Sequence, residues 1–154
     1  MGFFSKIFRS KSSHYGESLS EIVKKEVGKY DERSVNREMK KFENKKWNFD
    51  PVSYKESILV LFTLIGFYFT NSRSDVNFSE ASDVFLSKTA SQVVEGGSVG
   101  WSAMLSSNEP EKTASKQAAE RYFGSEPSQE QIEHFREHAQ SFFEVIESFD
   151  KTFG

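Results

Sequence analysis

Cysteine is absent from this chain, proline is scarce, and the most apolar run is short. The lack of cysteine excludes disulfides, thiolate nucleophiles and zinc sites built on sulfur, and it suits a reducing compartment. Only 3 prolines stand beside 16 phenylalanines, whose large rings fill the space between helices well. The most apolar run, residues 58–69, contains Thr63 and Gly66 and is shorter than the ~20 residues that span a bilayer. We therefore expect it to be a buried core helix.

The net charge of −3 conceals an asymmetry between the two parts of the chain. Residues 1–50 hold 12 Lys or Arg against 8 Asp or Glu, whereas residues 51–154 hold 8 against 15. The two parts therefore carry +4 and −7, which either attract each other or mark a site for a charged partner. Non-specific binding to nucleic acid is not favoured, and a cytoplasmic location is predicted.

The first residues do not read as a targeting signal, because Lys6 interrupts the apolar run too early for a secretory segment. Lys6 also occupies the position where N-myristoylation requires Ser or Thr. Four apolar residues nevertheless gather on one side of a helical wheel beside basic residues, a composition that suits an anionic membrane surface or an acidic groove. Packing on the domain's own core and disorder are the alternatives. These residues are Phe3, Phe4, Ile7 and Phe8.

Helix start and stop signals divide the rest of the chain. Ser18 and Glu21 form a capping box that predicts a first helix ending at Gly28, so residues 1–16 are taken as a separate segment and 17–154 as one domain. Asp50 and Pro51 predict the entry to the apolar helix, since Asp can cap and Pro suits the first helical position. Further helices are expected over residues 35–47, 77–95, 110–123 and 128–153. A solvated hairpin arm is the alternative for 35–47, and a buried strand for the apolar run.

A strict heptad pattern runs through the last of these segments and predicts a helix with one apolar seam. Phe143 and Val145 widen the seam beyond that of a two-stranded coiled coil, which favours a bundle core, although a homodimer remains an alternative. The predicted fold is an all-α, single-domain bundle of about five to seven helices around a central apolar helix near residues 51–70. The seam residues are Ile132, Phe135, Ala139, Phe142, Ile146, Phe149 and Phe153.

Two short motifs are typical of hydrolases. Gly96 to Gly100 reads G-x-S-x-G, which would make Ser98 a nucleophile, but that motif belongs to a parallel sheet and this chain predicts helices, so a connector is favoured. His134, Glu137 and His138 read H-x-x-E-H, a zinc-protease motif. A catalytic zinc needs a third ligand, expected downstream where few residues remain, and the heptad turns both histidines away from the core. No metal site, catalytic residue or cofactor is predicted.

Five glutamates line the outer columns of the same helix and form an acidic face. The face is interpreted either as a solvated surface or as a docking strip for a basic partner protein. Its residues, the predicted partner-binding set, are Glu130, Glu133, Glu137, Glu144 and Glu147.

Function is predicted from these features as non-catalytic protein binding. In size, acidity and lack of a catalytic set, the chain resembles small bacterial cytosolic immunity or antitoxin proteins, which cover the basic active site of a toxin. This resemblance implies an inhibitor with a basic partner. The alternatives are a small hydrolase that uses Ser98 or a metal held by His134 and His138, and a peripheral membrane adaptor acting through residues 1–13.

Overall fold

Helices make up the regular structure of the computed structural model, which describes residues 10–89 and 98–153. Within these residues there are seven helices and no strand, arranged as a single helical domain, so the predicted all-α bundle is confirmed. The helices are α2 (Lys11–Gly28), α3 (Glu32–Asn44), α4 (Pro51–Ser72), α5 (Phe78–Thr89), α7 (Ser98–Leu105), α8 (Pro110–Phe123) and α9 (Gln129–Thr152).

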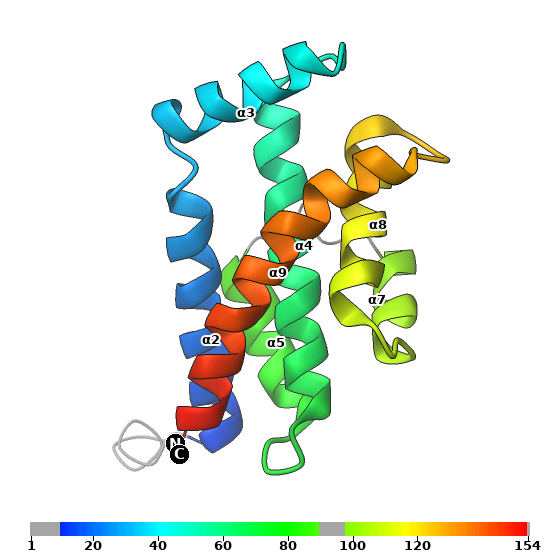
Figure 1. Cartoon of the computed structure of the whole chain (residues 1–154). Coiled ribbons are helices and arrows are strands. Elements are labelled where there is room, and N and C mark those ends of the chain that lie inside the picture. Colours follow the sequence, from blue (N-terminus) through cyan, green and yellow to red (C-terminus); the bar gives the residue numbers. More distant parts are fainter. Residues whose placement is uncertain (1–9, 90–97, 154) are drawn as a thin grey trace.

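The central helix is α4, as the apolar run predicts. It starts at Pro51, and the Asp50 side chain accepts a hydrogen bond from the Val52 N–H, which confirms the expected cap. Helices α2, α5, α7, α8 and α9 all pack against it (Figure 1). Buried side chains on every side of α4 explain why its sequence shows little amphipathic pattern.

By length and composition alone α4 could cross a membrane, because it has 22 residues and is longer than the apolar run itself. Most of its most apolar part is buried inside the bundle, and the core helix of a soluble protein passes the same test. The span therefore gives weak evidence for a membrane, and the cytoplasmic location stays a prediction.

Helix α9 lies diagonally across α4, and its heptad seam faces the core (Figure 1). Ser128 and Gln131 form the predicted capping box, and Phe135, Ala139, Phe142 and Ile146 are buried. The ring of Phe142 stacks on Phe62 of α4 with centroids 4.0 Å apart. The predicted seam is confirmed over this part of the helix.

The far end of α9 is tied to the rest of the bundle by polar contacts. Arg73, just after α4, donates to the Asp150 carbonyl oxygen at 2.7 Å and to its carboxylate at 3.1 Å. The Tyr15 hydroxyl of α2 donates to the same carboxylate at 2.8 Å. These contacts fix the position of α9 along α4. They thereby also set where the residues nearer the N-terminus of α9 lie relative to α4.

Helix α2 begins earlier than its sequence indicates. It starts at Lys11 with Ser10 as the cap, so the prediction of a start at Ser18 is wrong and the Ser18 and Glu21 pair lies inside the helix. Tyr15 and Gly16 are buried in this added stretch. Their packing against the rest of the bundle stabilises the first turns of the helix without a capping box. Residues 1–9, with Phe3, Phe4, Ile7 and Phe8, lie outside the described residues, and their predicted contacts stay predictions.

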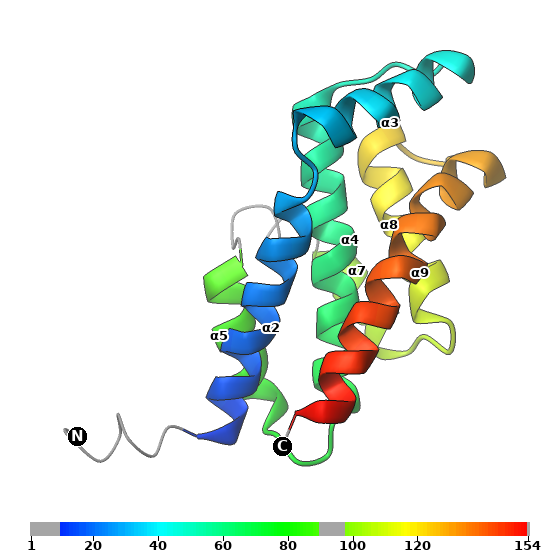
Figure 2. The same cartoon turned by 60° about the vertical axis from the view of Figure 1, so that its left-hand side comes forward.

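Helices α2 and α5 lie side by side (Figure 2), and Gly16 is the residue that lets them approach. A Cβ atom at Gly16 would overlap the Ala81 carbonyl oxygen and would lie 3.1 Å from the Phe85 backbone nitrogen. Both atoms belong to the backbone of α5, which cannot rotate away as a side chain can. The α2–α5 contact therefore requires glycine at position 16.

Replacing Gly16 by Ala should lower the free energy of unfolding by roughly 2 kcal/mol, because the added methyl group forces the two helices apart. Urea denaturation followed by circular dichroism measures this change. Gly28→Ala is the matched control, since a Cβ there meets nothing within 4 Å, and it should leave stability equal or slightly higher. Equal stability of both variants would show that α2 and α5 are not in close contact.

Candidate functional site

Helix α3 crosses the end of the bundle above α2, α4 and α9 (Figures 1 and 2). It is anchored by Phe42, a fully buried side chain whose ring contacts aromatic rings from α4, α8, α9 and the α3–α4 connection. These partners are Trp47, Phe49, Tyr54, Tyr122, Phe123 and His134. Such ring contacts stabilise the fold in addition to the burial of apolar area by each residue. One turn earlier on the same face of α3 stands Glu38, which is consequently carried into the interior.

His134 and His138 stand one turn apart on α9 and meet this face of α3. Their side chains are only 8% and 16% exposed, so the inference from the heptad that both turn outward is wrong. The heptad identifies the side that packs on α4, but α3 covers a second side of the upper part of α9. Glu137, the fourth residue of the H-x-x-E-H motif, is exposed.

Glu38, His134 and His138 form what we call the Glu–His cluster. The Glu38 carboxylate lies 3.3 Å from His138 Nε2 and 3.6 Å from His134 Nε2, using a different oxygen for each. The Tyr54 hydroxyl of α4 lies 2.8 Å from His134 Nε2 and 3.2 Å from His138 Nε2. The Tyr30 hydroxyl, between α2 and α3, lies 2.6 Å from His138 Nδ1. Four segments of the chain thus converge on two imidazole rings.

Burial sets the protonation of the cluster. Loss of water around His134, with a smaller contribution from neighbouring His138, lowers the pKa of His134 from 6.5 to about 4. Burial alone would raise the pKa of Glu38, but its hydrogen bond and charge interaction with His138 hold that pKa below the usual value. Burial also raises the pKa of Tyr54 and of Tyr30. At neutral pH the cluster therefore combines a carboxylate, a neutral His134 and two protonated phenols.

Among the described residues, the side chains of the Glu–His cluster are close enough together to hold a metal ion. One ligand atom from each of Glu38, His134 and His138 lies within 4.8 Å of the other two. The third group comes from α3, upstream of the histidines, whereas the sequence argument sought it downstream. Chemically, two imidazole nitrogens and one carboxylate can hold a divalent metal ion or a proton.

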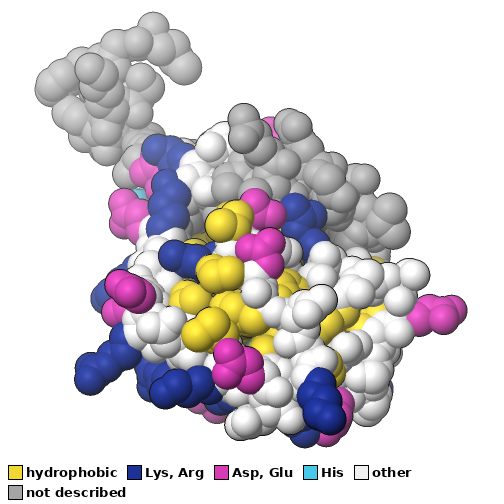
Figure 3. Space-filling model, turned by 90° about the horizontal axis from the view of Figure 1, so that it is seen from above, with side chains coloured by type: hydrophobic (Ala, Val, Ile, Leu, Met, Phe, Trp, Pro, Cys, Tyr) yellow, Lys and Arg dark blue, Asp and Glu magenta, His cyan; other side chains and the backbone are white. Residues whose placement is uncertain are grey.

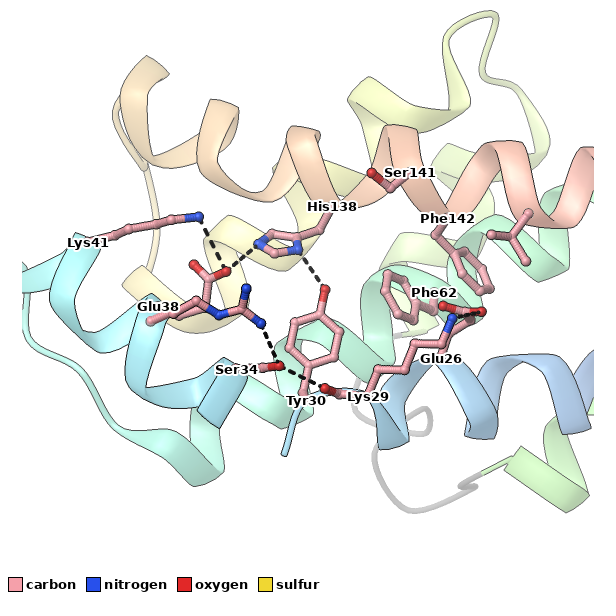
Figure 4. Close-up of a pocket in the computed structure, with 12 residues that line it drawn as sticks. Glu26, Lys29, Tyr30, Ser34, Glu38, Lys41, Phe62, His138, Ser141 and Phe142 are labelled. Atoms are coloured by element: carbon pink, nitrogen blue, oxygen red, sulfur yellow. Dashed lines mark hydrogen bonds and ion pairs between the residues drawn. The ribbon is translucent and has the colours of Figure 1, made fainter. Parts of the chain in front are cut away.

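Two cavities border the cluster. The first, which we call the α3 groove, has a volume of about 440 Å³ and lies between the C-terminal end of α2, the length of α3 and the middle of α9 (Figure 4). Tyr30, Glu38 and His138 lie along one part of it, and Phe62 and Phe142 line its apolar floor. The second cavity, of about 350 Å³, is lined by His134, Glu137 and Lys45 among others.

All five glutamates of the acidic face are exposed, as the sequence predicts. Three of them have ion-pair partners: Glu130 pairs with Lys45, Glu133 with Arg136 and Glu147 with Lys151. The Lys45–Glu130 pair, at 2.5 Å, joins the basic first part of the chain to the acidic remainder. Among the described residues, Glu137 and Glu144 form no ion pair. Part of the acidic charge is thus neutralised by ion pairs within the molecule, and part of it stays unpaired on the described surface.

The end of the bundle also carries hydrophobic side chains on its surface. Figure 3, which looks down on this end, shows them gathered in a patch with charged side chains around it. Trp47, Phe49, Tyr122 and Phe123 line a cavity of about 520 Å³ there. These rings also contact Phe42, so this cavity lies at the outer edge of the aromatic packing that anchors α3.

The alternative catalytic residue, Ser98, falls at the edge of the described residues. Gly96 and Gly97 lie outside the described residues, and Ser98 is the first residue of α7 with its side chain outside them too. The serine-nucleophile alternative therefore stays a prediction.

Sequence reasoning missed Glu38, although a signal for it was present. Val35 and Phe42 define the apolar face of α3, and Glu38 lies three residues after one and four before the other. An acidic residue inside an apolar stripe needs a buried partner.

The chain matches no model of a protein family, no curated protein and no solved structure.

The low pKa of His134 makes folding sensitive to acid. The unfolded chain binds a proton at His134 from about pH 6.5 downward, whereas the folded protein does so only near pH 4. Stability should therefore be fully present above pH 6.5 and fall as the pH falls toward 4, with Glu38 adding to the loss below its ordinary pKa. The contribution of His134 over this range is on the order of 3 kcal/mol.

Urea denaturation between pH 7 and pH 4, in buffer with a chelator, tests this expectation. His134→Gln should lose markedly less stability on acidification than the unmodified chain, because glutamine does not titrate. His14→Gln, at an exposed position on α2, should follow the unmodified chain. Parallel pH profiles for the unmodified chain and His134→Gln would contradict the assignment.

Proposed function

We propose that this chain is a non-catalytic protein-binding protein that contacts a basic partner through the acidic face of α9. The observation that carries the proposal is the pair Glu137 and Glu144, exposed two turns apart on α9 without an ion pair among the described residues. Unpaired surface carboxylates attract a partner of opposite charge and speed its association.

The α3 groove supports the same contact. It runs beside the column of Glu137 and Glu144, and Val145, 37% exposed, lies at its edge. Phe62 and Phe142 form an apolar floor that could take one side chain of a partner. Protein interfaces combine such a desolvated anchor with a charged rim, where the anchor contributes most of the affinity and the rim contributes orientation.

The finer form of the proposal is an inhibitor of the immunity or antitoxin type, acting in the cytoplasm by covering the basic active site of a toxin. An acidic helix face beside an apolar groove has the chemistry needed to cover a cationic surface. A metal-dependent function is the second candidate, because the buried Glu38 supplies the third ligand that the H-x-x-E-H motif lacks.

Charge reversal on the acidic face tests the proposal. The untagged chain is purified from its native cell, and any protein that co-elutes in stoichiometric amount is identified and titrated against the purified chain. Glu137→Lys combined with Glu144→Lys should weaken binding at least about tenfold and reduce its dependence on salt, because the attraction becomes repulsion.

The matched control is Glu21→Lys combined with Glu43→Lys, which changes the net charge equally at exposed positions on α2 and α3. It should bind like the unmodified chain. Equal weakening by both pairs would reduce the effect to overall net charge. Unchanged binding by the α9 pair would overturn the proposal that this face is the contact.

A further inference from the structure

We propose that Glu38, His134 and His138 bind a divalent transition-metal ion of the Zn²⁺ class. The site goes beyond the proposed protein-binding function and uses none of the glutamates of the acidic face, although Glu38 and His138 border the same groove. Its ligand set, two imidazoles four residues apart on one helix and a carboxylate from another, is one that zinc uses in proteins.

The distances within the cluster fit a metal of this size. Zinc bonds of 2.0–2.2 Å place neighbouring ligand atoms of a tetrahedron about 3.4 Å apart. The separations from the Glu38 carboxylate to His138 Nε2 and His134 Nε2 are 3.3 Å and 3.6 Å. One ligand atom from each residue lies within 4.8 Å of the other two, so the side chains need only draw together to share one ion.

The hydrogen bonds of the cluster depend on which nitrogen of each neutral histidine carries the proton. If His138 carries its proton on Nε2, toward Glu38, then Tyr54 donates to His134 and a Glu38 oxygen faces the His134 nitrogen with no hydrogen between them. If His134 carries the Nε2 proton instead, Tyr54 donates to His138, and the other Glu38 oxygen faces a bare nitrogen. If both rings carry their proton on Nε2, each faces a Glu38 oxygen, and the Tyr54 hydroxyl beside them has no bare Nε2 to donate to.

One oxygen of the Glu38 carboxylate makes no hydrogen bond within the described part of the chain. This atom, Oε2, is buried, and the Glu38 side chain is only 8% exposed. A buried carboxylate oxygen without a partner is unfavourable, and native structures contain few of them. Nε2 of His134 lies 3.6 Å from Glu38 Oε2, which is longer than a hydrogen bond. A metal ion satisfies both imidazole nitrogens and the carboxylate at once.

Two tyrosines complete the surroundings of the ion. To bind metal through Nε2, an imidazole must carry its proton on Nδ1, and a hydrogen bond from Nδ1 usually fixes that tautomer. Tyr30 stands 2.6 Å from Nδ1 of His138 and can accept that bond (Figure 4). The Tyr54 hydroxyl lies beside both Nε2 atoms, where a fourth ligand or its hydrogen-bond partner would lie.

Two cavities give an ion access to the site, and the positive charge of Lys41 nearby disfavours its binding. Glu38 and His138 border the α3 groove, while His134 borders the second cavity, so solvent reaches both sides of the cluster. Lys41 lies 3.5 Å from Glu38, but its side chain is 57% exposed and can turn into water when a cation binds.

Zinc chloride titrated into the untagged, chelator-treated full chain tests the proposal by calorimetry. One ion should bind per chain, and the melting temperature should rise with zinc concentration. Glu38→Gln, His134→Gln and His138→Gln should each weaken binding by about a hundredfold or more. Tyr30→Phe should weaken it by about tenfold, the scale expected for a group that orients a ligand.

His14→Gln is the control, because His14 is the third histidine of the chain and is exposed on α2. It should bind zinc like the unmodified chain. Circular dichroism confirms that each variant is folded, and the absorption spectrum of bound Co²⁺ gives a second readout. Tetrahedral cobalt bands should appear with the unmodified chain and disappear with His138→Gln.

Three results would overturn the proposal: no stoichiometric zinc binding, weakening by His14→Gln equal to that by the cluster variants, or undiminished binding by folded Glu38→Gln. The outcome is separate from that for the protein partner. Glu137→Lys with Glu144→Lys should keep its zinc site, since both residues are exposed and outside the cluster.

Discussion

The site depends on the packing of the buried Phe42 ring. Helix α3 crosses the end of the bundle and is anchored there by this ring, which packs among aromatic side chains from four segments. Because Glu38 lies one turn away on the same face, placing Phe42 in the core also places a carboxylate there. The free energy of burying the aromatic cluster therefore offsets the desolvation of Glu38, which an isolated acidic residue could not sustain.

Much of the fold follows from signals within short stretches of sequence. The Asp50 and Pro51 entry, the Ser128 and Gln131 capping box, and the apolar seam of α9 are each encoded by residues within one or two turns of each other. The start of α2 is different, because the helix extends back to Lys11 through packing of Tyr15 and Gly16 on distant parts of the chain. The local signal at this start is Ser10 alone, which caps the helix by accepting from the Ser13 N–H but lacks the Glu or Gln partner of a capping box.

The Glu–His cluster shows the same limit at the level of a site. A heptad describes one buried side of a helix, and it places His134 and His138 off that side, although the Tyr54 hydroxyl of α4 reaches both rings. The heptad carries no information about α3, which covers another side of α9 and buries both rings. Glu38 could be singled out as an acid within an apolar stripe, but its partners lie almost 100 residues away in sequence. Only the crossing of α3 over α9 brings them together.

The two surfaces of α9 consequently have different physical characters. On the exposed side, Glu137 and Glu144 are solvated charges, whose interactions are long-ranged, weak individually and screened by salt. On the side toward α3, Glu38 and the histidines are largely removed from water, where a charge without a counterpart is costly and a bound cation is correspondingly stabilised. A cation held there would link α3 to α9 directly, in addition to the packing of Phe42. The groove between these helices would then have one wall fixed by aromatic packing and metal ligands together.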